Sequence, residues 1–205
     1  MSDNSEQVKL DIVGLAQGLH ARGWLLGTSG NLSAVVDREP LVLAITPSGA
    51  DKGELKTKQI LTIDQNCDLV NMSEGKPSDE SPLHVSIVKA RNAGAVVHTH
   101  SVWSNILSDV HQTGLEIEGF EMLKGLSGIT THEHKEWVPI IENSQDMLSL
   151  AKTVEGVLAR LPQIHAVLLR RHGLYTWGRD VKEAKRHVEI LEFLLEVLGR
   201  KRSRS

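Results

Sequence analysis

The order of apolar and polar positions along the chain predicts alternating helices and strands. Residues 5–22 carry apolar side chains at helical spacing, and Gly23 ends that helix. Further helices are expected over 81–93 with Ser81 as the cap, over 102–108, over 145–161 after the cap Asn143, and over 181–198. Strands are expected over 41–45, 60–63, 68–72, 96–100, 116–123, 138–141, 166–169 and 174–177, with a hairpin joining the second and third. Because no repeat or linker divides the chain, one domain is expected over 1–205, with short disordered ends at about 1–5 and 200–205.

Residues 96–101 place two histidines at the end of a predicted buried strand. Side chains alternate between the two faces of a strand, so His98 and His100 point to one side and Thr99 to the other. These two residues are called the strand histidines below. Neutral imidazole is a common zinc ligand, so two imidazoles on one face favour a metal site. The alternative is a pair of ordinary surface histidines on a polar strand face.

A third ligand and a rival pair are present elsewhere in the chain. His172 follows a predicted buried strand and precedes Gly173, which allows the backbone to approach closely. Together with the strand histidines it would form a three-histidine site with an open position, the arrangement of catalytic zinc. His132 and His134 form a second His-X-His pair, but they lack flanking apolar strand residues, which favours a loop.

Three loops rich in small polar residues lie beside the predicted strands and helices. Such loops can bind a phosphate through backbone N–H and hydroxyl groups, without a dedicated lysine. Each loop alone is typical of an ordinary turn, but three of them together favour a phosphate site. The expected donors are Thr28, Gly30, Asn31, Ser48, Gly49 and Ser78. An open zinc site beside them suggests Lewis-acid chemistry on the carbonyl of a sugar phosphate.

Composition narrows the class of protein further. The 205 residues are 40% hydrophobic and 24% charged, as in ordinary globular proteins. The net charge of −3 does not favour binding to nucleic acid or to an anionic membrane. Cys67 is the single cysteine, no apolar run approaches the roughly 20 residues of a membrane span, and the polar start lacks a signal-peptide core. We therefore expect a cytoplasmic protein with no membrane and no nucleic-acid partner.

Five short motifs follow one another along the chain: Gly27-Thr28-Ser29-Gly30-Asn31, Thr46-Pro47-Ser48-Gly49, Pro77-Ser78-Asp79-Glu80, His98-Thr99-His100 and Arg171-His172-Gly173. Their order resembles that of the class II aldolase and adducin family, and the resemblance extends from about residue 8 to residue 198. It implies an α/β fold of three layers, with a central, mostly antiparallel sheet flanked by helices. It also implies a homotetramer with active sites between subunits, one Zn²⁺ per subunit held by the three histidines, and a sugar-phosphate substrate.

Within this family, residues 120–125, 138–143 and 169–178 are most similar to methylthioribulose-1-phosphate dehydratases. That likeness implies loss of water from 5-methylthioribulose 1-phosphate in methionine salvage, giving a 2,3-diketone. It favours Glu121, expected at the end of strand 116–123, as the acid/base group; the alternative is a solvated strand-end carboxylate. Glu80 resembles the acid/base group of the aldolases, and its alternative role is a carboxylate at a helix entry. Asp79 departs from the family pattern, which usually has serine there, and its carboxylate would repel a phosphate.

Two other functions fit the same motifs. An aldolase or 4-epimerase of the fuculose-phosphate or ribulose-phosphate type would share the metal chemistry but not the residues that move the proton. A non-catalytic assembly module like the adducin head would share the fold without needing a metal. The presence of all three histidines together with Glu121 favours an enzyme. Iron, manganese and cobalt also accept imidazole, so the residues alone do not select zinc.

Overall fold

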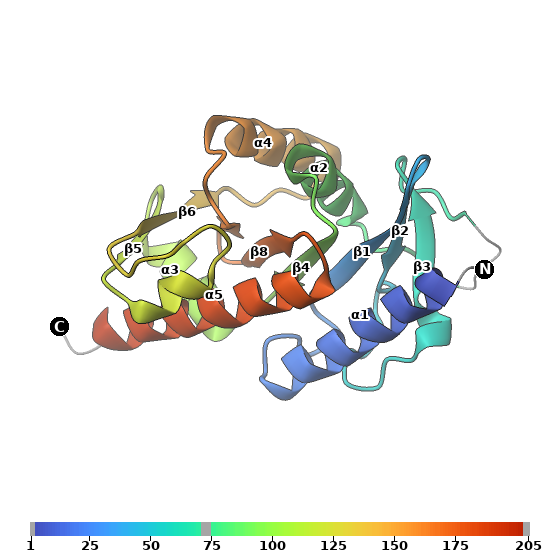
Figure 1. Ribbon diagram of the computed structural model, residues 1–205, viewed down its shortest axis with the longest axis horizontal. Helices are drawn as coiled ribbons and strands as arrows, with labels where there is room; N and C mark the ends of the chain where they lie inside the picture. The colour runs from blue at the N-terminus through green and yellow to red at the C-terminus, as the bar shows by residue number, and fades with distance from the viewer. Residues whose placement is uncertain (1–2, 71–74, 203–205) are drawn as a thin grey trace.

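A computed structural model of the protein describes residues 3–70 and 75–202. The described residues form a sheet of eight strands in the order β3-β2-β1-β4-β8-β7-β6-β5 (Figure 1). The strands are β1 (Asn31–Arg38), β2 (Leu41–Ile45), β3 (Leu61–Asp64), β4 (Ala95–Thr99), β5 (Gly114–Glu118), β6 (Lys135–Ile141), β7 (Ala166–Leu169) and β8 (Gly173–Gly178). Among these described strands, β6 and β7 form the one parallel pair. The α/β fold with a mostly antiparallel sheet is therefore confirmed.

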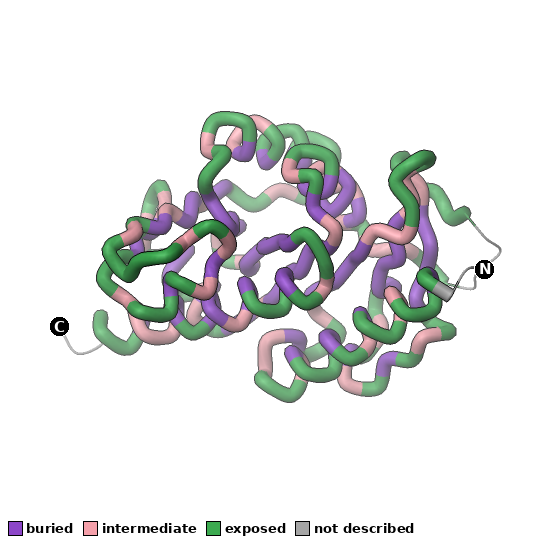
Figure 2. Tube along the Cα trace, in the orientation of Figure 1, coloured by how far each residue is buried: buried purple, intermediate pink, exposed green. Residues whose placement is uncertain are grey.

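Helices cover both faces of this sheet. They are α1 (Asp3–Ala21), α2 (Ser81–Arg91), α3 (Val102–Val110), α4 (Met147–Arg160) and α5 (Val181–Arg202), with 3-10 helices η1 (Thr57–Gln59) and η2 (Glu121–Gly125). Helix α5 packs on β4 and β8 and contacts α1 and α3, whereas α2 and α4 pack together on the opposite side (Figure 1). The sheet is the buried layer between them (Figure 2).

Each face of the sheet has its own hydrophobic core, and β4 contributes to both. Val97 belongs to the core that includes residues of α1 and α5, and Val96 to the core that includes residues of α2 and α4. Because side chains alternate along a strand, His98 continues the face of Val96. His98 therefore lies on the face of the sheet that α2 and α4 cover.

Strand β1 was not expected from the sequence. Its first half is fully buried, yet it includes the polar residues Asn31 and Ser33, so no simple alternation marks it. Both side chains find a buried partner in His84: Ser33 Oγ lies 2.7 Å from His84 Nδ1, and Asn31 Oδ1 lies 2.5 Å from His84 Nε2. Hydrogen bonding inside the protein thus compensates for burying two polar residues in a central strand.

Two strand predictions are wrong. Residues 68–70 turn back on β3 as the predicted hairpin requires, with a bridge from Leu69 to Ile63 and a hydrogen bond from the Val70 N–H to the Thr62 carbonyl, but they do not form a regular strand. Residues 71–72 of that predicted strand lie outside the described residues. The strand expected over 116–123 ends at Glu118, and the next residue, Gly119, has a φ of +77° that turns the chain away. Glu121 consequently begins η2 and does not end a strand.

Two helix caps also differ from the prediction. Ser81 is the first residue of α2, not its cap, because its Oγ donates to the Ser78 carbonyl at 2.6 Å. Glu80 occupies the cap position, and its side chain makes no capping hydrogen bond. Helix α4 is capped by the side chain of Asp146, so Asn143 is not its cap.

The helices at both ends extend further than expected. Residues 3–5 belong to α1 and residues 200–202 to α5, so the expectation of disorder is wrong for these positions. In the last turns of α5, Arg200 donates to Glu196 at 2.7 Å, an i,i+4 pair that supports helix. Residues 1–2 and 203–205 lie outside the described residues. None of the helices found in the described ranges has the length and apolar character needed to cross a membrane.

Candidate metal centre and substrate cavity

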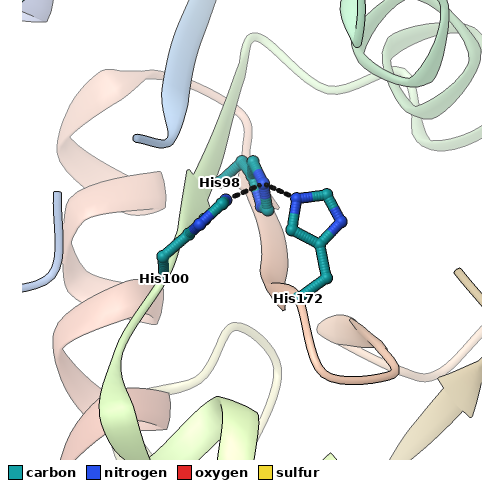
Figure 3. Close-up of side chains that lie close together, drawn as sticks. All are labelled: His98, His100 and His172. Atoms are coloured by element: carbon teal, nitrogen blue, oxygen red, sulfur yellow. Dashed lines mark hydrogen bonds between the residues drawn. The ribbon is translucent and has the colours of Figure 1, made fainter. Parts of the chain in front are cut away.

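Three histidines from two distant segments meet beside the end of β4 (Figure 3). His98 lies in β4 and His100 just beyond it, while His172 precedes β8. The Nε2 atom of His98 is 2.8 Å from that of His100 and 3.3 Å from that of His172. The candidate ligand atoms all lie within 4.8 Å of one another. The structure thus brings together the three histidines that the sequence singled out.

The outer ring nitrogens indicate which atoms are free to bind a metal. His98 Nδ1 donates to the Leu174 carbonyl at 3.0 Å, and His172 Nδ1 lies 3.2 Å from Asn143 Oδ1, so each Nε2 turns a lone pair inward. Burial, with repulsion from neighbouring histidines, lowers the pKa of His98 well below its ordinary value and that of His100 to about 4. Burial also lowers the pKa of His172. Three neutral nitrogens with converging lone pairs are a donor set that fits a cation.

Close backbone approach and strand alternation build this cluster. A Cβ atom on Gly173 would lie 2.0 Å from the Thr99 carbonyl oxygen and 3.0 Å from His98 Cε1, so only glycine fits after the third histidine. Thr99 points to the opposite face, where its Oγ1 donates to Glu192 of α5 at 2.5 Å. Both expectations drawn from the sequence, the need for glycine and the alternation along β4, are confirmed.

Glu80 lies directly against the histidine cluster. Its Oε1 is 3.2 Å from His172 Nε2, and its Oε2 is 3.5 Å from His98 Nε2. The amide of Asn31 donates to Glu80 Oε2 at 2.5 Å and to Ser78 Oγ at 3.1 Å. The Asn31 side chain therefore orients this carboxylate towards the cluster, and its own donors are both engaged.

A cavity of about 460 Å³ opens beside the cluster. Its walls include Glu80, His100, His172 and all six expected phosphate donors, Thr28, Gly30, Asn31, Ser48, Gly49 and Ser78. Asp79 also lines it, but its exposed carboxylate pairs with Lys76 at 2.6 Å. Three loops that are separate in the sequence thus surround one space next to the histidines.

The chain is similar to known proteins along almost its whole length. Residues 11–198 match the family model of the class II aldolase and adducin N-terminal domain. The chain belongs to this family. It is 41% identical over 188 residues to a methylthioribulose-1-phosphate dehydratase of Marinobacter nauticus, covering 90% of this chain and 89% of that protein. It is 39% identical over 198 residues to one of Pseudomonas aeruginosa, covering 96% and 95%. The crystal structure of YgbL from Klebsiella pneumoniae superposes with a TM-score of 0.81 at 25% identity, covering 97% of this chain and 91% of that one.

For this member of the class II aldolase family, the sequence interpretation missed one charged residue of the cavity. Lys52 is 1% exposed, and its Nζ donates to the carbonyl oxygens of Thr28 and Ala50, both at 2.9 Å. These bonds use two of the three N–H groups of an ammonium, and the first stabilises Thr28 at its positive φ of 66°. Of the described residues that line the cavity, Lys52 is the only lysine or arginine. The sequence feature that could have identified Lys52 is its position, three residues after Gly49 of the Thr46-Pro47-Ser48-Gly49 motif.

Glu121 lies away from this cavity within its own chain. It begins η2, its side chain is 73% exposed, and it is not among the described residues that line the cavity. Its carboxylate accepts from Lys124 Nζ at 2.7 Å and lies 3.8 Å from His132 Nδ1. The hydrogen bond and charge of Lys124 lower the pKa of Glu121, so the carboxylate is ionised at neutral pH.

The rival pair of histidines faces two different carboxylates. His132 Nδ1 lies 3.8 Å from Glu121 Oε2, whereas His134 Nε2 lies 2.8 Å from Glu136 Oε2. Among the described residues, the three-histidine cluster is the only group of three or more such side chains with converging ligand atoms. Geometry therefore favours it over the rival pair.

We expect His172→Ala to remove most of the bound metal while leaving the fold largely intact, because His172 is only half-buried and belongs to neither hydrophobic core. Metal per subunit is measured by plasma mass spectrometry, and the fold by circular dichroism. The variant carrying both His132→Ala and His134→Ala is the control and should retain its metal. Loss of metal from that control alone would contradict the assignment.

Proposed function

We propose that this protein is a zinc-dependent methylthioribulose-1-phosphate dehydratase of methionine salvage. It removes water from 5-methylthioribulose 1-phosphate and releases 2,3-diketo-5-methylthiopentyl 1-phosphate. The observation that carries this proposal is the identity of about 40% with proteins of that name, which extends over almost the whole chain and includes the cavity-lining segments. We further propose that residues 1–205 act as one domain in the cytoplasm, where the free thiol of Cys67 suits a reducing environment.

Zinc is the metal that we propose for the cluster, because three protein ligands with neutral imidazole nitrogens are typical of catalytic zinc. When bound, the ion would act as a Lewis acid that makes the proton beside a carbonyl more acidic. The chain supplies everything else that the reaction needs: a place for the phosphate, an orientation for the sugar, and a group that carries the proton.

The phosphate end of the substrate fits the part of the cavity formed by the polar loops at residues 27–31 and 46–49. Backbone N–H groups and hydroxyls there offer neutral donors, and Lys52 adds a positive charge. Burial lowers the pKa of Lys52, while the negative charges of Asp51 and Glu80 oppose that change. A phosphate dianion beside the ammonium would favour its charged form. We therefore assign Lys52 as the main charge partner of the phosphate.

We expect Lys52→Met to raise the KM for the phosphorylated substrate by about 10- to 100-fold, the value of a lost charge-assisted hydrogen bond. The effect on kcat should be smaller, because the phosphate is bound equally in the ground and transition states. Steady-state kinetics measures both. Lys58→Met, at an exposed position of η1, is the matched control. An unchanged KM in Lys52→Met would show that neutral donors alone hold the phosphate.

Dehydration needs one group that takes a proton from C3 and returns a proton to the hydroxyl leaving C4. Loss of the C3 proton leaves an enediolate, and departure of the protonated C4 hydroxyl as water gives an enol that becomes the diketone. A positioned acid/base group contributes roughly 10²- to 10⁴-fold to such a step. We assign this role to Glu121, whose carboxylate is ionised, and the orientation of the sugar hydroxyls to Glu80, which contacts the histidine cluster.

Since Glu121 lies outside the cavity of its own chain, this assignment requires that a second copy of the chain supplies it. Exposed apolar side chains support self-association into the homotetramer that we propose. Val102, Ile106 and Val110 recur every four residues on α3 and are 68%, 42% and 44% exposed. Phe193, on the neighbouring α5, is 45% exposed. An apolar helix face of this kind is typical of an interface between subunits.

We expect Glu121→Gln to keep metal and substrate binding but to lower kcat by at least about a hundredfold, and Glu80→Gln to lower it less. Mixing inactive Glu121→Gln subunits with inactive His172→Ala subunits should restore part of the activity, because some sites then combine intact residues from two chains. Stopped assays after subunit exchange measure this recovery. Wild-type turnover by Glu121→Gln together with an inactive Glu80→Gln would instead favour an aldolase-type mechanism.

The central test is incubation of the purified protein with 5-methylthioribulose 1-phosphate, followed by NMR and by the absorbance of the enol and diketone. Formation of the diketone phosphate is the expected result. Cleavage between C3 and C4 to dihydroxyacetone phosphate would identify an aldolase, and inversion at C4 an epimerase. A protein without stoichiometric metal and without turnover would be an assembly module.

A further inference from the structure

A second buried polar network, separate from the histidine cluster, holds the segment that follows Glu121. Ser127 lies two residues after η2, and all its polar groups are bonded. Its N–H donates to His187 Nε2 at 3.1 Å, its carbonyl accepts from His165 Nε2 at 2.8 Å, and its Oγ donates to Glu183 Oε1 at 2.5 Å. The three partners are between 2% and 9% exposed. A short surface segment is thus tied to the interior through its main chain.

The two histidines need different protonation states to hold Ser127. His187 Nδ1 donates to the Trp177 carbonyl at 2.7 Å, so its Nε2 must accept and the ring is neutral. Burial lowers the pKa of His187, which favours that state. His165 donates from Nε2 to Ser127 and from Nδ1 to Glu136 Oε2 at 3.0 Å, so its ring is protonated. Burial would lower the pKa of His165, but bonding to the Glu136 carboxylate outweighs it and raises this pKa.

The same segment is held on either side of Ser127. On the side of Glu121, Leu123 and Leu126 are buried, and Gly125 packs so closely on α5 that a Cβ there would lie 2.3 Å from Ile190 Cδ1. On the other side, Glu136 is 1% exposed and accepts from His134 Nε2 at 2.8 Å. The exposed carboxylate of Glu121 therefore projects from a backbone that is fixed at several points.

We propose that His187 and His165 are positioning residues for the acid/base step, because they hydrogen-bond to the Ser127 main chain and so fix the position of Glu121. This inference rests on the proposed function. Neither histidine belongs to the metal cluster or lines the substrate cavity. A displacement of about 1 Å of a catalytic group can cost on the order of a hundredfold in rate, so a fixed backbone next to Glu121 has a direct kinetic value.

The test uses the full-length protein and three variants. His187→Leu removes the acceptor for the Ser127 N–H, whereas His187→Gln retains an acceptor and a donor on a similar side chain. Val188→Ala is the matched control, since it creates a small cavity at the neighbouring buried position and leaves the hydrogen-bond partners of Ser127 unchanged. Each variant is characterised by kcat, KM, bound metal, melting temperature and amide hydrogen exchange of residues 119–134.

We expect His187→Leu to lower kcat about tenfold or more, with little change in KM or in metal content, and to lose exchange protection at the Ser127 amide. His187→Gln should recover most of both properties. Val188→Ala should lower the melting temperature while keeping kcat. A wild-type kcat in His187→Leu despite lost protection would overturn the proposal. So would an equal loss of kcat in Val188→Ala, because the effect would then reflect stability alone.

Hydrogen exchange separates failure of this inference from failure of the proposed function. If the wild-type protein does not dehydrate the substrate, the proposed function fails, and the kinetic role of the network fails with it. If the wild-type protein is active but His187→Leu keeps both its exchange protection and its kcat, only the positioning role is wrong.

Discussion

Three neutral imidazole nitrogens that face one another, on one buried and two half-buried histidines, are the constraint on which the rest of the site depends. The lone pairs of nitrogens at these distances repel one another, so the rings need contacts with other groups to stay in place. The Leu174 carbonyl holds His98, Asn143 holds His172, and the absence of a side chain at Gly173 lets β8 approach β4. Glu80, oriented by Asn31, adds a negative charge beside the cluster. This part of the fold holds the three imidazole nitrogens close together.

Helix α5 connects the histidine cluster with the segment that carries the proposed acid/base group. Through Glu192 it accepts a hydrogen bond from Thr99, on the reverse face of the strand that carries His98. Glu192 is 2% exposed, and this burial raises the pKa of its carboxyl group to about 7. Through His187 the same helix binds the main chain of Ser127. One helix thus contacts both the strand of the histidine cluster and the loop beyond η2.

Much of the fold could be predicted because local patterns recur in the right order. The helices and most of the strands follow from apolar spacing, and the motif order carried the family. Strand β1 escaped prediction because Asn31 and Ser33 are buried through hydrogen bonds to distant residues, and no local pattern reports that. The strand expected to reach Glu121 failed because Gly119 adopts a positive φ, which the sequence permits but does not require.

The sequence by itself determined features that depend on neighbouring residues: the common face of His98 and His100, and three loops of small donors. Only the tertiary structure decided which distant groups meet. Lys52 turns inward to a loop 24 residues earlier, a Cβ at position 173 would meet the Thr99 carbonyl of β4, and Glu121 lies outside its own cavity. The reason is physical, since the periodicity of a strand sets the direction of a side chain relative to its own backbone. Contacts across the chain depend on how the helices pack against the sheet.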